Sequence, residues 1–128
     1  NVKSLIGDGH ALLGNAGEFL DPVFSSGITI AVKSSSLACG CLKREAAGEA
    51  VDWAEDYERA LKVGVNAFRT YVEAWYDGDF QKVVFSKSHN EDVRRMISSI
   101  LAGYAWDVSN PFVEKSKRRL NLIRELCE

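Results

Sequence analysis

The chain has 128 residues, of which 46% are hydrophobic and 27% charged, and a formal net charge of −2 at pH 7. These values indicate one soluble globular domain and give no sign of nucleic acid or an anionic membrane as a general partner. No apolar run approaches the roughly 20 residues that span a bilayer. Three cysteines, Cys39, Cys41 and Cys127, lack zinc-site spacing. We therefore expect a cytoplasmic protein without a metal site.

The first predicted elements are a turn, a strand and a helix. Gly7-Asp8-Gly9 is a turn signal, and the apolar run His10–Gly14 has the length of a strand ended by glycine. A helix is expected from Ser25 or Ser26 to about Arg44, with a serine as its N-cap. The apolar positions on its helical period are Ile28, Val32, Leu37, Cys41 and Leu42.

The rest of the chain predicts further helices. An aromatic stripe with a period of three or four indicates a long helix over residues 51–76, which Asp77-Gly78 ends. Residues 80–85 fit either a strand or a helical turn. Asn90 is a predicted N-cap for the next helix, with one apolar face down to Tyr104, and Asn110-Pro111 begins the last one. The predicted fold is mainly α, with about four helices and one or two short strands.

Several other polar residues have ordinary structural interpretations. The last helix carries a basic run that we expect to face solvent, made of Lys115, Lys117, Arg118 and Arg119. His10 and His89 have no serine or cysteine partner placed for a triad, so both are expected to be structural or exposed. Glu18 fits a base, a turn cap or a solvent-facing residue. Asp21 fits a cofactor contact or a lock on its own loop.

Residues 14–28 are the most informative stretch of the sequence. A strand that ends at Gly14-Asn15, a loop with Asp21-Pro22 and a helix that opens at Ser25-Ser26-Gly27 would leave backbone N–H groups free at a positive helix end. Such an end binds anions and favours the negative charge on the pyrimidine edge of a reduced flavin. An ordinary helix cap is the alternative interpretation of the same residues.

The whole string closely resembles the second flavin-contacting motif of FAD-dependent monooxygenases of the p-hydroxybenzoate hydroxylase type, and particularly of flavin-dependent halogenases. In that motif a Gly-Asp-Ala strand end precedes Asp-Pro-x-Phe-Ser-Ser-Gly and a helix. Gly14-Asn15-Ala16 and residues 21–27 match these two parts. A looser resemblance to the helical C-terminal region of halogenase-like proteins continues through residues 51–53, 68–72, 74–78 and 101–104.

This resemblance implies the C-terminal part of an α/β FAD-dependent oxidoreductase, with residues 1–28 as one wall of the flavin site and residues 29–128 as a helical C-terminal domain. The residues that it assigns to cofactor binding are Gly14, Asn15, Asp21, Pro22, Ser25, Ser26, Gly27 and Ile28. Asn15 would approach the ribityl or pyrophosphate part of FAD. The backbone amides around Ser26, Gly27 and Ile28 would face the isoalloxazine ring and, in halogenases, a halide. No catalytic residue is assigned.

Departures from the motif narrow the expected activity. Asn15 replaces the usual aspartate, so it hydrogen-bonds without carrying charge. Phe24 stands where tryptophan-halogenating relatives have a glutamate, which disfavours indole and favours a phenolic, pyrrolic or carrier-tethered aromatic substrate. Halogenase, hydroxylase and other flavin oxidoreductases, a dehydrogenase among them, stay open.

The chain has no Gly-x-Gly-x-x-Gly opening, which supplies the adenosine and pyrophosphate grip. We therefore expect its partner to be a missing N-terminal FAD-binding region. Alone, the chain is expected to be an inactive fragment that does not bind FAD tightly and self-associates through uncovered edges. The alternative is a non-catalytic helical interaction domain whose loop merely resembles the flavin motif.

Overall fold

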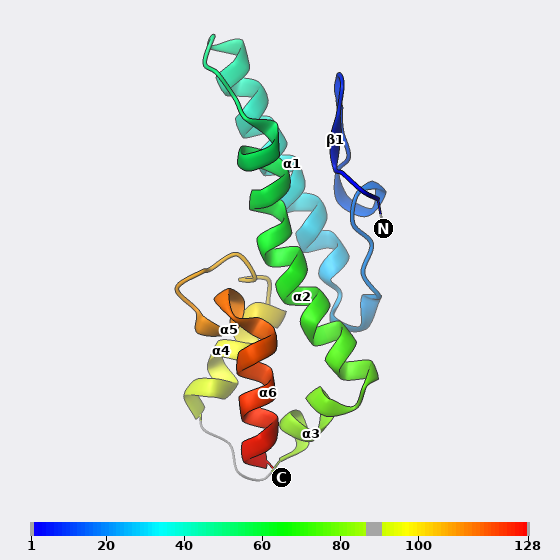
Figure 1. Ribbon diagram of the computed structural model, residues 1–128, viewed down its shortest axis with the longest axis vertical. Helices are drawn as coiled ribbons and strands as arrows, with labels where there is room; N and C mark the ends of the chain where they lie inside the picture. Colours follow the sequence, from blue (N-terminus) through cyan, green and yellow to red (C-terminus); the bar gives the residue numbers. More distant parts are fainter. Residues whose placement is uncertain (1, 87–90, 128) are drawn as a thin grey trace. The chain divides into compact units, whose positions relative to one another are not determined.

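The computed structural model describes residues 2–86 and 91–127, and most of these residues lie in helices (Figure 1). The predicted fold, mainly α with short strands, is confirmed. Nowhere in the described ranges is a helix both long and apolar enough to cross a membrane. Contacts group the chain into two compact units, one up to Val65 and one from Asn66 onward, and each is described by itself.

The first unit opens with a small hairpin. Strands β1 (Ile6–Gly7) and β2 (His10–Ala11) are antiparallel, with Ile6 opposite Ala11. The predicted turn forms as expected, and Gly9 takes a φ of +69° that favours glycine. The predicted strand His10–Gly14 is wrong at its end, because Gly14 already begins a short 3₁₀ helix, η1 (Gly14–Ala16).

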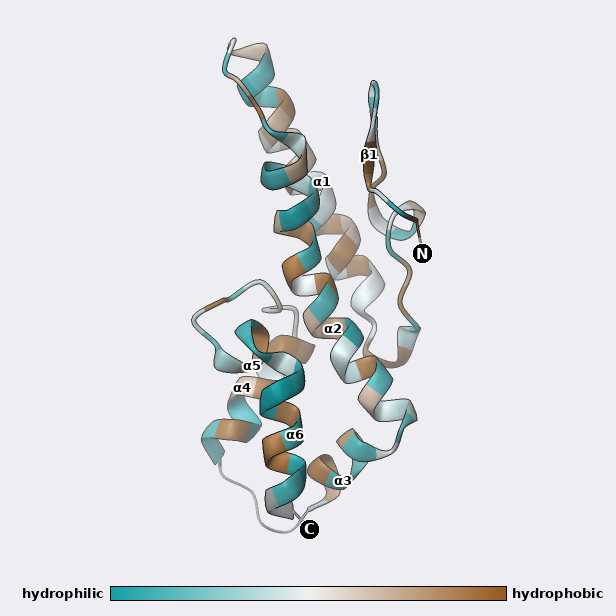
Figure 2. Cartoon of the chain, in the orientation of Figure 1, coloured by the Kyte–Doolittle hydropathy of each residue, from teal (hydrophilic) through white to brown (hydrophobic). Residues whose placement is uncertain are grey.

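The loop after η1 leads through a second 3₁₀ turn, η2 (Pro22–Phe24), into the long helix α1 (Ser26–Ala46). The predicted helix is therefore confirmed, but several of the apolar residues on its helical period are not buried. Ile28, Val32 and Leu42 are exposed, Ile28 by 79%. The buried side of α1 is instead formed by Ser26, Ile30, Ser34, Ala38 and Cys41. Hydrophobic residues recur along α1 in Figure 2, and this helix has a second apolar face that its own unit leaves uncovered.

The predicted helix over residues 51–76 has an unusual first part. A π-helical turn, η3 (Ala54–Arg59), precedes the α-helix α2 (Ala60–Tyr76). The Arg44 guanidinium at the end of α1 holds the start of η3, with Nη1 2.9 Å from the Asp56 carboxylate. The buried apolar side chains of the first unit include Leu5, Ile30, Cys41, Tyr57, Leu61 and Val65.

The second unit consists of the later part of α2 and four helices, α3 (Asp79–Phe85), α4 (Glu91–Leu101), α5 (Pro111–Glu114) and α6 (Ser116–Cys127). Aromatic rings fill its interior. Tyr71 and Trp75 of α2 both meet the ring of Phe80 edge to face, with centroids 5.2 and 6.2 Å apart. Phe112 and Leu120 are also buried. The aromatic stripe of α2 is therefore core packing in this unit.

Three predictions from the sequence can be compared with the structure of this unit. Residues 80–85, which fitted a strand or a helix, are helical, and Gly78 at φ +80° ends α2 before them. The prediction of one continuous last helix is wrong, because Lys115 (φ −130°, ψ 46°) separates α5 from α6. Tyr104 is exposed rather than on a buried face. The expected N-cap Asn90 and His89 lie outside the described residues.

Candidate functional site

Gly14 turns the chain from the hairpin toward α1. Its φ of +53° lies in the left-handed region, and a Cβ placed there would approach Ala31 Cβ to 3.2 Å. Its N–H donates to Ser34 Oγ at 2.9 Å, and that hydroxyl donates to the carbonyl oxygen of Ala31 at 2.9 Å. Backbone torsion and close packing therefore both favour glycine at this position.

Asn15 and Gly27 lie close together although 12 positions separate them. Asn15 belongs to η1, and Gly27 to the first turn of α1. A Cβ added at Gly27 would stand 3.5 Å from Asn15 Oδ1. The absence of a side chain at Gly27 thus keeps the backbone of the α1 N-terminus open beside the Asn15 amide.

Asp21 and Pro22 shape the loop rather than line a cavity. The Asp21 carboxylate accepts a hydrogen bond from the N–H of Val23 at 3.2 Å, and Pro22 occupies the first position of η2. Both side chains are exposed. Of the two interpretations of Asp21, the structure shows the lock on its own loop.

The start of α1 departs from an ordinary helix cap. Ser25 occupies the N-cap position with φ 53° and ψ 31°, and its side chain makes no capping hydrogen bond. The expected serine cap is therefore wrong, since a capping side chain needs the extended backbone that Ser25 lacks. The first N–H groups of an α-helix have no acceptor within the helix, so the positive end of α1 keeps its capacity for an anion.

Ser26 is the other unusual residue at this helix start. Its side chain is only 1% exposed, and among the described residues its Oγ has no hydrogen-bond partner. Leaving a buried hydroxyl unpaired costs about 1–3 kcal/mol, so such groups are rare without a reason.

A shallow groove of about 470 Å³ lies between η1 and α1. Its lining residues are Leu13, Gly14, Asn15, Gly27, Ile28, Ala31 and Ser35. Four of the eight predicted cofactor-binding residues thus meet in one groove, whereas Asp21, Pro22, Ser25 and Ser26 are outside its lining. Sequence reasoning missed Leu13, Ala31 and Ser35. The helical period would have found Ala31 and Ser35, since they follow Ile28 by three and seven positions.

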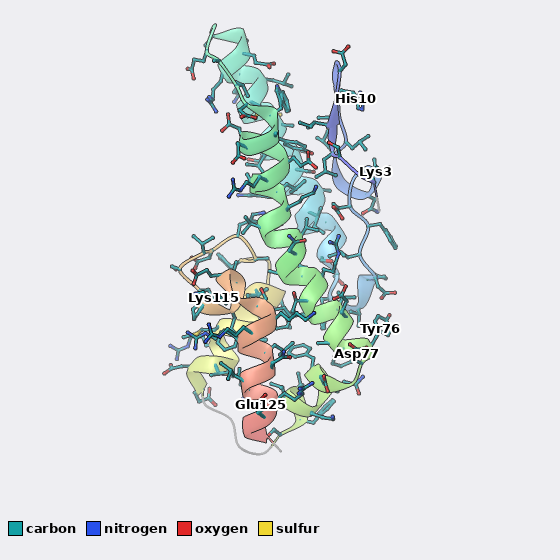
Figure 3. All side chains as sticks on the ribbon, in the orientation of Figure 1. Lys3, His10, Tyr76, Asp77, Lys115 and Glu125 are labelled. Atoms are coloured by element: carbon teal, nitrogen blue, oxygen red, sulfur yellow. The ribbon has the colours of Figure 1, made fainter. Side chains whose placement is uncertain are left out.

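The remaining candidates stay outside this groove. His10 is exposed on the hairpin (Figure 3) and lines a second, more apolar crevice of about 600 Å³ with Cys39, Leu42 and Trp53. Its Nδ1 lies 3.2 Å from the Asp8 carbonyl oxygen. Glu18 is 5% exposed, so it is not the solvent-facing residue that was one of its interpretations. The basic run is exposed as expected: Lys115 lies just before α6 (Figure 3), and Lys117, Arg118 and Arg119 lie in its first turn.

Comparison with known proteins gives this groove a context. No protein-family profile matches the chain. It is 34% identical over 86 residues to a tryptophan 2-halogenase of Chondromyces crocatus, covering 65% of this chain and 16% of that protein. It is 28% identical over 79 residues to a 1H-pyrrole-2-carbonyl peptidyl-carrier-protein chlorinase of Pseudomonas fluorescens, covering 59% of this chain and 17% of that protein.

A solved structure extends the similarity to nearly the whole chain. The crystal structure of a flavoprotein/dehydrogenase from Cytophaga hutchinsonii superposes with a TM-score of 0.91 at 44% identity. The match covers 96% of this chain and 30% of that one. The chain thus spans less than a third of the length of each of these relatives. The chain therefore corresponds to a segment of flavin-dependent halogenases and related FAD flavoproteins.

Proposed function

We propose that residues 1–28 form one wall of the FAD site of a flavin-dependent oxidoreductase, either a halogenase or an aromatic hydroxylase. The observation that carries this proposal is the groove in which Gly14, Asn15, Gly27 and Ile28 meet at the N-terminus of α1. By itself the 128-residue chain supplies electrostatics and shape to the site. It binds no FAD tightly and performs no turnover, because the adenosine and pyrophosphate grip belongs to another region.

The residues present fit a flavin in three respects. The α1 N-terminus offers backbone N–H groups that have no acceptor within the helix, and Ser26 adds a buried hydroxyl without a partner among the described residues. Gly27 leaves room for a ring to approach the helix backbone. Asn15, exposed beside the groove, would hydrogen-bond a ribityl hydroxyl or the pyrophosphate.

When bound, FAD would supply the redox chemistry by which oxygen is transferred to a halide or directly to the substrate. The amides of Ser26, Gly27 and Ile28 would hold negative charge on the isoalloxazine edge without reorganising, since their direction is fixed by α1. In a halogenase the same helix end would hold the halide.

The second apolar face of α1 supports the assignment to a larger site. Ile28, Val32 and Leu42 are exposed, and the hairpin beside them has only two strands. A helix that is apolar on more than one side is typical of the interior of a larger protein. We propose that the FAD-binding region covers this face, and that the isolated chain self-associates through it.

The substrate that we propose is a phenol, a pyrrole or an aromatic ring tethered to a carrier protein. Phe24, half-buried in η2, offers no carboxylate to assist an indole. One relative is named for a carrier-bound pyrrole and the other for tryptophan, so product analysis has to include both substrate types.

The test uses the full-length gene product with FAD, NADH, a flavin reductase and oxygen, with and without chloride or bromide, and mass spectrometry of the products. We expect halogenated phenol or carrier-bound pyrrole that appears only with halide. Hydroxylated product without any halogenated product would exclude the halogenase and leave aromatic hydroxylation as the activity. Absence of both, together with no flavin binding, would overturn the proposal in favour of a helical interaction domain.

A further inference from the structure

Two consecutive side chains of the π-helical turn hold the base of the hairpin. Tyr57 Oη donates to the carbonyl oxygen of Leu12 at 2.6 Å. Glu58 accepts from the N–H of Leu5 at 3.2 Å and from Ser4 Oγ at 3.0 Å. Leu5 and Leu12 are themselves joined, since the Leu12 N–H donates to the Leu5 carbonyl oxygen at 2.8 Å. Both chain segments that enter the hairpin are therefore fixed to η3.

The π-turn explains how neighbours along the chain reach one target. Consecutive side chains of an α-helix diverge by about 100° because the helix has 3.6 residues per turn. The wider π-turn reduces this divergence, so Tyr57 and Glu58 both reach the hairpin. Short π-helical segments inside helices are frequently found at functional sites.

The fixed segment continues directly into the groove. Leu12 is two residues before Gly14, whose N–H is held by Ser34 Oγ at 2.9 Å. Tyr57 and Ser34 are both 0% exposed. Burial raises the pKa of the Tyr57 hydroxyl, which keeps it a hydrogen-bond donor at neutral pH. In such dry surroundings water does not replace a lost hydrogen bond, so the position of the loop depends on these contacts.

We propose that Tyr57 and Glu58 form a clamp that sets the position of residues 12–15, and through them the affinity of the wall for flavin. The two are positioning residues, because neither lines the groove. This inference rests on the proposed function, because it takes flavin to be the ligand.

The first measurement follows the loop itself in the full-length gene product without FAD. Tyr57→Phe removes only the hydroxyl, and we expect amide hydrogen exchange at residues 12–17 to become about fivefold faster, as loss of one hydrogen bond implies. The matched control is Tyr71→Phe in the second unit. Tyr71 is also 0% exposed and donates to the carbonyl oxygen of Phe112 at 3.4 Å. The control should leave exchange at residues 12–17 unchanged.

The second measurement is an FAD titration of the same variants. We expect the Kd to rise about fivefold for Tyr57→Phe and to stay the same for Tyr71→Phe. Where Tyr57→Phe fails to fold, Ser34→Ala takes its place, since it releases the Gly14 N–H and should act in the same direction.

The outcomes separate the clamp from the proposed function. Faster exchange with raised Kd supports both. Faster exchange in Tyr57→Phe, together with a wild-type protein that binds no FAD, would overturn the proposed function and the role of the clamp in flavin affinity. For Tyr57→Phe, unchanged exchange at residues 12–17, or faster exchange with an unchanged Kd for FAD, would overturn the clamp. The proposed function would still be supported if the wild type binds FAD.

Discussion

Two residues of the opening loop take left-handed backbone torsions, and only one was expected from its type. Gly14, at φ +53°, adopts the left-handed region without strain, whereas Ser25, at φ 53°, does not. Sequence reasoning therefore expected Gly14 to end the strand, and it expected Ser25 or Ser26 to cap α1. The strained serine leaves the helix end without a side-chain cap, which is the property that a ligand site requires.

The unpaired hydroxyl of Ser26 gives a prediction in which stability and binding change in opposite directions. In the 128-residue chain, Ser26→Ala should leave the free energy of unfolding unchanged or raise it by up to about 1 kcal/mol, because a buried group without a partner disappears. In the full-length gene product the same change should weaken FAD binding. Urea denaturation and flavin titration measure the two effects.

Ser34→Ala is the matched control, since Ser34 is equally buried but makes two hydrogen bonds. It should lower the free energy of unfolding by about 1–2 kcal/mol. A Ser26→Ala variant destabilised as much as Ser34→Ala would show that Ser26 already has a partner and would contradict the assignment.

Asp79 gives the second unit a pH-dependent contact. Its carboxylate lies 2.6 Å from Arg124 Nη1 and 3.3 Å from Lys82 Nζ, and the hydrogen bond from Arg124 is the main cause that holds the pKa of Asp79 below its usual value. Because the folded pKa is below the unfolded one, the stabilisation is present above the unfolded pKa of about 4 and is lost as the pH falls through the folded pKa.

We therefore expect Asp79→Asn to be less stable than the native chain at pH 7 and the difference to narrow as the pH falls toward about 3. Urea denaturation at a series of pH values measures this. A difference that is constant between pH 7 and pH 3 would show that Asp79 contributes through packing or neutral hydrogen bonds instead.

Helix α1 shows what an apolar period does and does not determine. The period predicted the helix and its extent, because a repeat of three or four residues is sufficient for that. It did not determine which side is buried, since α1 is apolar on two sides and small residues such as Ser34 and Ala38 form the buried one. Only neighbouring elements, here η1 and η3, determine which of the two faces is buried.

The break between α5 and α6 had a weaker signal. Asn110 caps α5 as expected, with its Oδ1 accepting from the Phe112 N–H at 3.0 Å. The break at Lys115 has no proline or glycine to announce it. Ser116 Oγ donates to the Val113 carbonyl oxygen at 2.9 Å and so satisfies one of the carbonyls at the end of α5.

The first turn of α6 carries three cations, Lys117, Arg118 and Arg119, at the positive end of the helix. This arrangement is unfavourable, because acidic residues stabilise helix N-termini. Arg118→Glu should therefore raise the free energy of unfolding by about 0.5 kcal/mol, and Arg118→Gln by less. Denaturation in 1 M NaCl provides the control, since salt should reduce the gain. A stability loss at low salt would mean that Arg118 makes a favourable contact.

For the molecule as a whole, the sequence predicted the helical fold, the flavin-type loop and four of the seven residues that line its groove. The motif was sufficient to predict the loop, because its glycines and serines favour particular local backbone conformations. The π-turn could not be predicted, because its side chains look like an ordinary amphipathic helix along the sequence. The role of Leu13 needed the position of η1 against α1, which comes from packing between distant segments, whereas Ala31 and Ser35 follow Ile28 on the helical period.

FAD titration of the full-length gene product tests whether the groove between η1 and α1 is one wall of a flavin site. The matched glycines of α1 give the design: Gly27 borders the groove, whereas a Cβ at Gly40 meets nothing within 4 Å. We predict a stoichiometric bound-flavin spectrum for the wild type and for Gly40→Leu, and its loss for Gly27→Leu. Flavin bound equally well by Gly27→Leu would contradict the assignment of this groove to a flavin site.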